Sequence, residues 1–236
     1  MSEDYDVFDN VFDMPTLMTI NELRSKGIIQ YIKSSLAAGK ESKVYIAAAP
    51  DGSLRIAKIY LTVSAEFKKR MQYIAGDPRF SNVKHGSRSL IMIWARKEFK
   101  NMQTAHNAGI RVPLPMAVRK NVLIMEFVGD SEGNPVPILV DAEEITFNDY
   151  HQVIEQMTML YQRAKLVHAD LSEYNIFKTD GGVMLFDFGS AIDIRHPNSQ
   201  QFLLRDAVNI NRFFERRGIE ILDIAQVVGR IRGDTK

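Results

Sequence analysis

Three polar side chains in the second half of the chain have the types and the order that phosphoryl transfer from ATP requires. Asp170 lies within HADLSEYN (168–175), Asn175 ends that segment, and Asp187 opens the triplet DFG. An Asp can accept the proton of an attacking hydroxyl, whereas an Asn and a second Asp are hard oxygen ligands for Mg²⁺. Because Mg²⁺ also takes waters and phosphate oxygens, this sparse pair of ligands suffices. The pattern predicts a phosphoryl-transfer site.

The surroundings of Asp187 decide between such a site and a plain surface loop. Loops rich in Asp and Asn are common, which makes a surface loop the alternative interpretation. The apolar run VMLF (183–186) favours the site, because a strand that ends at Asp187 before a turn glycine places the carboxylate in a cleft. Either motif alone is a weak signal, but the two in this order are a strong one.

Lys58 is the candidate cation for the phosphates of ATP. It lies in LRIAKIY (54–60), on the same strand face as Ile56 and Tyr60. An edge-strand lysine turned to solvent is the alternative. Glu98 argues against that alternative, because it falls within the apolar stripe of a predicted helix over 90–108. The stripe contains Ile91, Ala95, Met102 and Ala105.

A carboxylate that faces a core needs a cation, since breaking a buried ion pair costs roughly 3–5 kcal/mol. The sequence therefore predicts that Lys58 and Glu98 form an ion pair, which aims the ammonium at the phosphates of ATP.

The elements that must carry these residues differ between the two halves of the chain. Periodicity and turn residues predict a helix over 16–26, then strands, the long helix, two more strands and finally three helices. The strands are expected over 31–36, 43–49, 54–60, 112–118 and 122–128, and the last helices over 146–165, 199–217 and 220–231. Strands followed by helices indicate a two-lobed α+β enzyme with a cleft between its lobes.

We expect four regions along the chain. Residues 1–15 form an acidic tail, 16–128 a strand-rich N-lobe, and 138–236 a helical C-lobe that carries the catalytic and metal loops. The stretch 129–137, with two Gly and two Pro, is predicted to be the hinge between the lobes.

Two backbone segments are candidates for holding the rest of the nucleotide. The loop AAGKES (37–42) lies between two predicted strands, and its Gly39 precedes Lys58 by nineteen residues. An ordinary hairpin loop is the alternative, but the position before Lys58 favours a loop that covers phosphates. The strand end MEFV (125–128) could offer backbone groups to adenine, which is also compatible with a plain buried strand.

Composition excludes several classes of chemistry. The 236 residues contain no Cys, which excludes disulfides, thiolate-bound zinc, iron–sulfur clusters and cysteine nucleophiles, and fits a reducing compartment. The five His are scattered, which disfavours a His-only metal centre. No apolar run approaches the ~18 residues of a membrane helix. We therefore expect a cytoplasmic protein with no membrane partner.

The chain is nearly neutral, with 30 Lys and Arg against 29 Asp and Glu, but its charges are unevenly distributed along the sequence. Residues 66–100 hold nine bases and three acids, whereas residues 121–187 hold twelve acids and three bases. Solvated faces would explain this without any partner. A basic face toward an anionic partner and an acidic cleft that collects metal ions are the functional alternative.

Ser199, where the next helix is expected, follows Asp187 by only twelve positions, and no Ala-Pro-Glu follows. This leaves no room for an activation segment that docks a peptide. The phosphate acceptor must then be held by a large partner or by the protein itself, or it must be water.

These motifs resemble the RIO family of atypical protein kinases, in its type-one branch. The resemblance runs over about 16–217 through AAGKESKV (37–44), RIAKIY (55–60), WARKEFKNM (94–102), MEFVGD (125–130) and HADLSEYN (168–175). It implies a protein-kinase-like fold in two lobes without an activation segment. It further implies Asp170 as the catalytic base, Asn175 and Asp187 as metal ligands, and an aspartyl-phosphate at Asp187. The implied ATP-binding residues are Ala38, Gly39, Lys40, Glu41, Ser42, Val44, Lys58, Glu98, Glu126 and Val128.

The same resemblance implies a function. It is that of an ATP- and Mg²⁺-dependent serine/threonine protein kinase, autophosphorylating, or an ATPase, with Mn²⁺ as a substitute metal. The implied partner is the small ribosomal subunit precursor, both rRNA and ribosomal proteins, whose maturation it would serve. Ser81, Ser87 and Ser89 are candidates for autophosphorylation. A nucleotide-gated RNA-binding assembly factor and a small-molecule kinase are the alternatives.

Overall fold

The strand-rich half of the chain is built on one antiparallel sheet. The structure, a computed structural model, describes residues 12–61, Tyr73, Asp77, Arg79 and 87–234. The five strands are ordered β1-β2-β3-β5-β4. Their bounds are β1 (Tyr31–Ala38), β2 (Ser42–Ala48), β3 (Leu54–Tyr60), β4 (Pro115–Arg119) and β5 (Val122–Glu126). The central strand, β3, is the one that carries Lys58.

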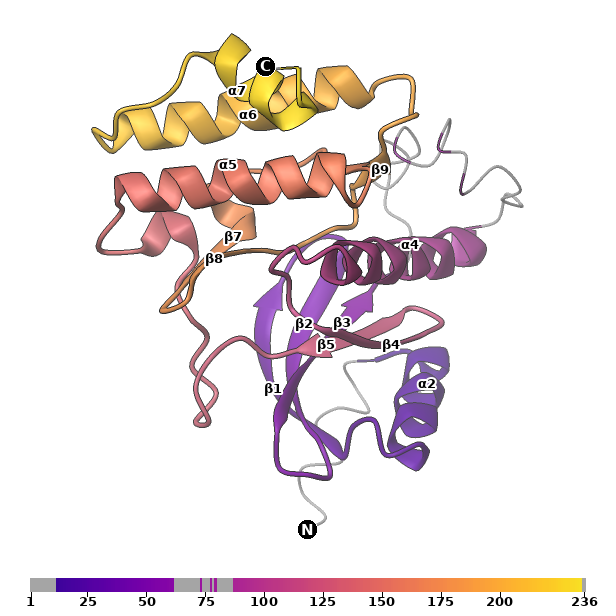
Figure 1. Cartoon of the computed structure of the whole chain (residues 1–236). Helices are drawn as coiled ribbons and strands as arrows, with labels where there is room; N and C mark the ends of the chain where they lie inside the picture. The colour runs from indigo at the N-terminus through magenta and orange to yellow at the C-terminus, as the bar shows by residue number, and fades with distance from the viewer. Residues whose placement is uncertain (1–11, 62–72, 74–76, 78, 80–86, 235–236) are drawn as a thin grey trace.

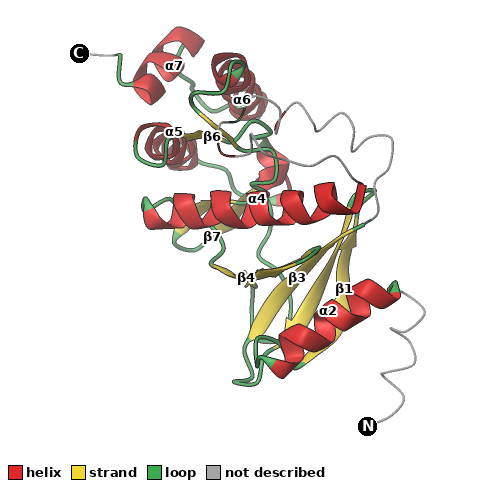
Figure 2. Cartoon of the chain, turned by 90° about the vertical axis from the view of Figure 1, so that its right-hand side faces the viewer, coloured by secondary structure: helices red, strands yellow, loops and turns green. Residues whose placement is uncertain are grey.

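Alternation along β3 gives the sheet two buried faces. Ile59 packs in a cluster with helix α2 (Met14–Ser25), whereas Tyr60 packs in the main core with helix α4 (Ser87–Asn107). Figure 2 shows the two helices on opposite sides of the sheet. Because side chains alternate along a strand, Lys58 faces α4.

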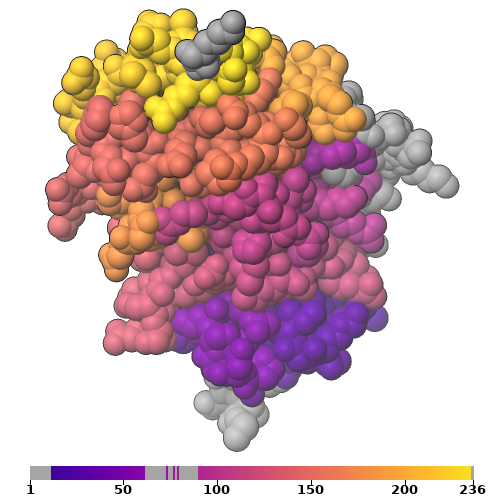
Figure 3. Space-filling view, viewed as in Figure 1, coloured from indigo at the N-terminus to yellow at the C-terminus, as the bar shows by residue number. Residues whose placement is uncertain are grey.

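The helical half follows the sheet along the chain and forms the other end of the molecule (Figures 1 and 3). Its long helices are α5 (Phe147–Gln162), α6 (Ser199–Arg216) and α7 (Ile224–Arg232). Its short elements are the hairpin β7 (Ile176–Thr179) and β8 (Gly182–Leu185), the pair β6 (Leu166–Val167) and β9 (Ile192–Asp193), and the turns η3 (Leu139–Asp141) and η4 (Glu173–Asn175). This α+β arrangement in two lobes is the predicted one.

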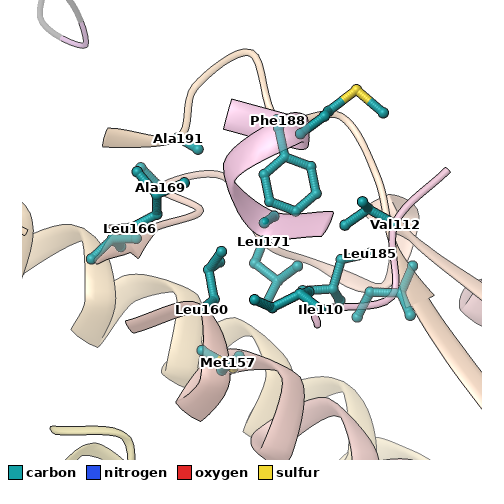
Figure 4. Close-up of a cluster of buried hydrophobic side chains, with 14 of the residues drawn as sticks. Ile110, Val112, Met157, Leu160, Leu166, Ala169, Leu171, Leu185, Phe188 and Ala191 are labelled. Atoms are coloured by element: carbon teal, nitrogen blue, oxygen red, sulfur yellow. The ribbon is translucent and has the colours of Figure 1, made fainter. Parts of the chain in front are cut away.

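Two buried side chains anchor the segments that carry the candidate catalytic carboxylates. Leu171 directly follows Asp170, and Phe188 directly follows Asp187; both side chains are fully buried. Figure 4 shows them within a single apolar cluster, together with Leu160, Leu166, Leu185 and Ala191. The two Asp residues are therefore held at the edge of one packed core.

The predicted hinge is an ordered turn. One carboxylate oxygen of Asp130 accepts hydrogen bonds from the backbone N–H groups of Glu132, Gly133 and Asn134, each at 2.9 Å. A bridge between Gly129 and Pro135 closes its base. An Asp that satisfies several turn N–H groups fixes the local backbone. The four regional boundaries expected from the sequence stay predictions.

Two predicted elements start later in the structure than expected. The strand predicted over 112–118 begins at Pro115, because Pro113 and Pro115 lack the N–H groups of a ladder. The helix predicted over 220–231 begins at Ile224, after a capping box in which Asp223 accepts from the N–H of Ala225 at 2.8 Å. Neither shift moves a predicted site residue.

Some predictions fall outside the described residues. These are the tail over 1–11, the bases at 68–70 and Ser81, and also the side chains of Ser87 and Ser89. Within the described ranges, no helix combines the length and apolar character needed to cross a membrane.

The packing of α2 on the sheet can be tested by truncating its buried face. Leu23 is 2% exposed, whereas Met18 on the same helix is 59% exposed. We expect Leu23→Ala to lower the free energy of unfolding by about 2–5 kcal/mol, because a cavity is left against the sheet. Met18→Ala should change it by less than about 0.5 kcal/mol. Urea unfolding measures both, and equal effects would contradict the packing.

Candidate active site

Lys58 is bound by two carboxylates from distant parts of the chain. Its ammonium donates to both oxygens of Glu98, at 2.9 and 3.0 Å, and to one oxygen of Asp187, at 3.0 Å. The predicted ion pair between Lys58 and Glu98 is confirmed. The bond to Asp187 adds a link between β3 in the N-lobe and the segment after β8 in the C-lobe.

Burial sets the electrostatics of this triad. Lys58 and Glu98 are buried, whereas the Asp187 side chain is 41% exposed. Burial disfavours the ammonium of Lys58, but the charges of Asp187 and Glu98 outweigh it and raise the pKa. Burial raises the pKa of Glu98 to about 7, against the opposing effect of Lys58. The lysine is therefore a fixed positive charge beside the exposed carboxylate of Asp187.

The β7–β8 hairpin brings Asn175 next to the DFG triplet. Asn175 directly precedes β7, and Phe186 directly follows β8, and the N–H of Phe186 donates to the carbonyl of Asn175 at 3.0 Å. The side-chain amide of Asn175 donates to the carbonyl of Asp170 at 2.8 Å. The three residues singled out for phosphoryl transfer thus meet at the open end of one hairpin, with the Asp170 side chain exposed.

The backbone at Asp187 has an unusual conformation. Its φ is +61°, in the left-handed region that Asp tolerates better than most residues. Two residues on, a Cβ at Gly189 would lie 2.8 Å from the Trp94 indole nitrogen and 3.3 Å from a Glu98 oxygen. Glycine is required there because α4 approaches the backbone so closely.

Helix α6 holds the backbone on both sides of Asp170. The carboxylate of Asp206 accepts from the N–H groups of Ala169, at 2.7 Å, and Leu171, at 3.0 Å. The guanidinium of Arg205 donates to the carbonyl of Ala169. Burial raises the pKa of Asp206 to about 7, although the bonded N–H groups counteract it. The sequence interpretation missed Asp206, although it is an acid in an apolar stripe, the same signal that identified Glu98.

Helix α4 holds the backbone that follows Asp187. The ammonium of Lys97 donates to the carbonyls of Gly189, at 2.8 Å, and Ala191, at 2.5 Å. The amide of Asn101 donates to the carbonyls of Phe188, at 2.9 Å, and Ala191, at 2.8 Å. Both side chains are fully buried. They were also missed, because a bond to a distant carbonyl leaves no trace in the local pattern.

The predicted phosphate loop is a tight turn at one end of the sheet. β1 includes Ala38 and β2 starts at Ser42, which leaves three residues, Gly39, Lys40 and Glu41, to connect them. The N–H of Gly39 donates to the carbonyl of Ser42 at 2.9 Å. In the ladder Val44 lies opposite Lys58, so both side chains face the same side of the sheet.

The residues predicted to contact adenine lie at the end of β5, just before the predicted hinge (129–137). The N–H of Glu126 donates to the carbonyl of Leu114 at 2.9 Å, and the carbonyl of Val128 accepts from Val136 at 3.1 Å. Glu126 and Val128 therefore each use one backbone group in a bond within the protein.

Known proteins share this arrangement. A sheet-based lobe with a Lys–Glu pair, joined to a helical lobe with an Asp and Asn loop, defines the class of two-lobed protein-kinase-like proteins. A model of the RIO domain matches residues 43–227, so the chain belongs to the RIO family. This confirms the predicted RIO-type kinase.

Two similar proteins carry RIO kinase names. The RIO-type serine/threonine-protein kinase Rio1 of Haloferax volcanii is 38% identical over 219 residues, which are 93% of this chain and 75% of the relative. The human serine/threonine-protein kinase RIO1 is 35% identical over 93% of this chain, but the match spans only 39% of the human protein.

A solved structure shares the fold. The Rio2 kinase of Chaetomium thermophilum, in a complex described as ADP/Mg²⁺-phosphoaspartate, gives a TM-score of 0.69 at 21% identity. The match covers 91% of this chain and 65% of that chain. At this identity the likeness supports the two-lobed fold alone.

His168 contacts the two residues that flank Asp187, Phe186 and Phe188. Its Nε2 donates to the carbonyl of Phe186 at 3.0 Å, and its ring lies edge-on to Phe188 at 4.9 Å. The ring is buried, and among the described residues its Nδ1 has no hydrogen-bond partner. Burial lowers the pKa of His168 from 6.5 to about 4.

This lowered pKa predicts a pH dependence of stability. Between pH 6.5 and about 4 the unfolded chain binds a proton at His168 that the folded chain does not, so stability falls as the pH falls. From pH 7 to pH 5 the native protein should lose about 2 kcal/mol more free energy of unfolding than His168→Gln. Urea unfolding at both pH values tests this. Parallel pH dependences would show that His168 does not titrate as expected.

Proposed function

We propose that the protein transfers phosphate from ATP in a Mg²⁺-dependent reaction, as a serine/threonine kinase. The observation that carries the proposal is the contact of Lys58 with both Glu98 and Asp187, at the end of the hairpin that presents Asn175. In this proposal Lys58 binds phosphates, Asp170 accepts the proton of the attacking hydroxyl, and Asn175 and Asp187 bind the metal.

The donor atoms fit magnesium. Carboxylate and amide oxygens are the ligands that Mg²⁺ prefers, and it binds through few protein groups when phosphate oxygens are present. Among the described residues, no group of three or more His, Asp and Glu side chains could hold a metal without such help. When bound, the ion would neutralise charge on the transferred phosphate. Mn²⁺ is proposed as a substitute.

The rest of the nucleotide is proposed to follow the face of the sheet that carries Lys58. The phosphates would lie under the turn between β1 and β2, and adenine would lie against Val44 and the predicted hinge. The proposed ATP-binding residues are those predicted from the sequence: Ala38, Gly39, Lys40, Glu41, Ser42, Val44, Lys58, Glu98, Glu126 and Val128. The ADP and Mg²⁺ in the name of the Rio2 complex support this proposal.

Asp187 is also proposed as a phosphate acceptor. Its carboxylate oxygen would attack the γ-phosphorus of ATP, the bond to the bridging oxygen would break, and ADP would leave. Water would then hydrolyse the acyl phosphate, which makes the net reaction an ATPase. The partial exposure of Asp187 and the phosphoaspartate named in the Rio2 complex support this step.

Replacing the proposed base tests the reaction. We expect Asp170→Asn to lower phosphate transfer from ATP to a serine or threonine hydroxyl by about 10²- to 10⁴-fold, because proton acceptance is lost. Binding of ADP should change little, since Lys58 and Glu98 are untouched. Asp180→Asn, on the exposed turn of the β7–β8 hairpin, is the matched control. Unchanged transfer in Asp170→Asn would reject the proposal.

The stability of the labelled phosphoprotein separates the two acceptors. Radiolabel from ATP that is released by hydroxylamine indicates an acyl phosphate and thus Asp187. Label that resists hydroxylamine and acid indicates a serine or threonine, the result expected of autophosphorylation.

We propose the small ribosomal subunit precursor, both rRNA and ribosomal proteins, as the partner during subunit maturation in the cytoplasm. The family and the excess of bases in 66–100 support this, although part of that stretch lies outside the described residues. We expect binding to small-subunit RNA to weaken at least about tenfold between 50 and 200 mM salt. Filter binding with and without ATP measures this. Failure to bind at 50 mM salt would reject the RNA partner, and affinity independent of ATP would reject a nucleotide-gated assembly factor.

A further inference from the structure

Asp77 and Arg79, which precede α4 in the chain, form an ion pair. The carboxylate of Asp77, which is 1% exposed, accepts from the N–H and Nε of Arg79 at 3.0 and 2.9 Å through one oxygen. Its second oxygen accepts from Nη2 of Arg79 at 2.6 Å. The two bonds from Nε and Nη2, one to each carboxylate oxygen, fix the plane of the guanidinium. The remaining Nη1 of Arg79 is thereby aimed at α4.

Asn101 accepts a hydrogen bond from that nitrogen. Nη1 of Arg79 donates to Oδ1 of Asn101 at 2.7 Å, and Nδ2 of Asn101 donates to the carbonyls of Phe188 and Ala191. An amide can turn over and exchange its oxygen for its nitrogen at little steric cost. The donor from Arg79 stabilises the same orientation that the two carbonyls require, in which Nδ2 faces them. In the other orientation Oδ1 would meet those carbonyls, and their bonds would be lost.

We propose that Arg79 is a positioning residue for the metal-binding Asp187. It acts through Asn101, whose amide holds the backbone immediately after Asp187 and so maintains its left-handed conformation. This inference rests on the proposed function, in which Asp187 binds Mg²⁺. Neighbours of metal ligands commonly change metal affinity by 10- to 100-fold.

Tyr73 packs between helices of the two lobes. The ring of Tyr73 lies 5.3 Å from that of Phe202 on α6 and 6.3 Å from that of Trp94 on α4. Tyr73 is 8% exposed, so this contact is buried.

The chain supplies a matched control for Arg79. Asp193 and Arg195 form the same kind of turn, with Asp193 accepting from the N–H, Nε and Nη2 of Arg195, each at 2.9 Å. The Arg195 side chain is 68% exposed, and within the described part of the chain it donates only to Asp193. Loss of Arg195 therefore removes a similar ion pair without removing a hydrogen bond to Asn101 or to the carbonyls of Phe188 and Ala191.

The test compares Arg79→Lys, Arg79→Ala and Arg195→Ala in the full chain. Electron paramagnetic resonance measures Mn²⁺ binding in the presence of ADP, and titration without metal measures ADP binding. We expect Arg79→Ala to weaken Mn²⁺ binding about tenfold and phosphate transfer similarly, with metal-free ADP affinity changed less than about twofold. Arg195→Ala should leave all three values within about twofold of wild type. Arg79→Lys keeps a cation for the buried Asp77 and should be intermediate.

A double variant tests the route through Asn101. If Arg79 acts through this amide, Arg79→Ala combined with Asn101→Ala should weaken Mn²⁺ binding no more than Asn101→Ala alone. Additive losses would overturn the route. Wild-type Mn²⁺ affinity in Arg79→Lys and Arg79→Ala, or equal losses in Arg195→Ala, would overturn the role of Arg79. Absence of metal-dependent transfer in the wild-type protein would instead contradict the proposed function.

Discussion

The sharing of one ammonium by two carboxylates is the constraint on which this structure depends. Glu98 is buried on α4 and requires a cation, and Lys58 in the central strand supplies it. The same ammonium binds Asp187, which arrives from the other lobe. The sheet, the helix across its face and the end of the β7–β8 hairpin must therefore meet at one point. The placement of the lobes follows from that meeting.

Around this point, helices fix the loops that carry Asp170 and Asp187 by forming hydrogen bonds with their backbones. Asp206 on α6 binds N–H groups on both sides of Asp170, while Lys97 and Asn101 on α4 bind carbonyls after Asp187. Buried polar groups that find partners rigidify their surroundings. The loops themselves are short and irregular, so their geometry comes from the helices that hold them.

The sequence predicts much of this fold because burial leaves periodic patterns. Alternation of apolar side chains predicts the strands, and an acid inside an apolar stripe identifies Glu98. Partners such as Asn101 could not be identified, because their bonds go to carbonyls about 90 residues away, and carbonyls are the same in every residue. The left-handed backbone at Asp187 was equally hidden, since a tertiary arrangement and not a local preference imposes it.

The buried face of α4 has a consequence for control of the enzyme. Three side chains of this helix bind other elements: Glu98 binds the central strand, and Lys97 and Asn101 bind the opposite lobe. At Gly189 the helix lies so close to the backbone that a Cβ would not fit. An outward rotation of α4 would leave several buried polar groups without hydrogen-bond partners, at a cost of several kcal/mol. Control of activity by rotation of α4 would therefore cost a large amount of free energy in this protein.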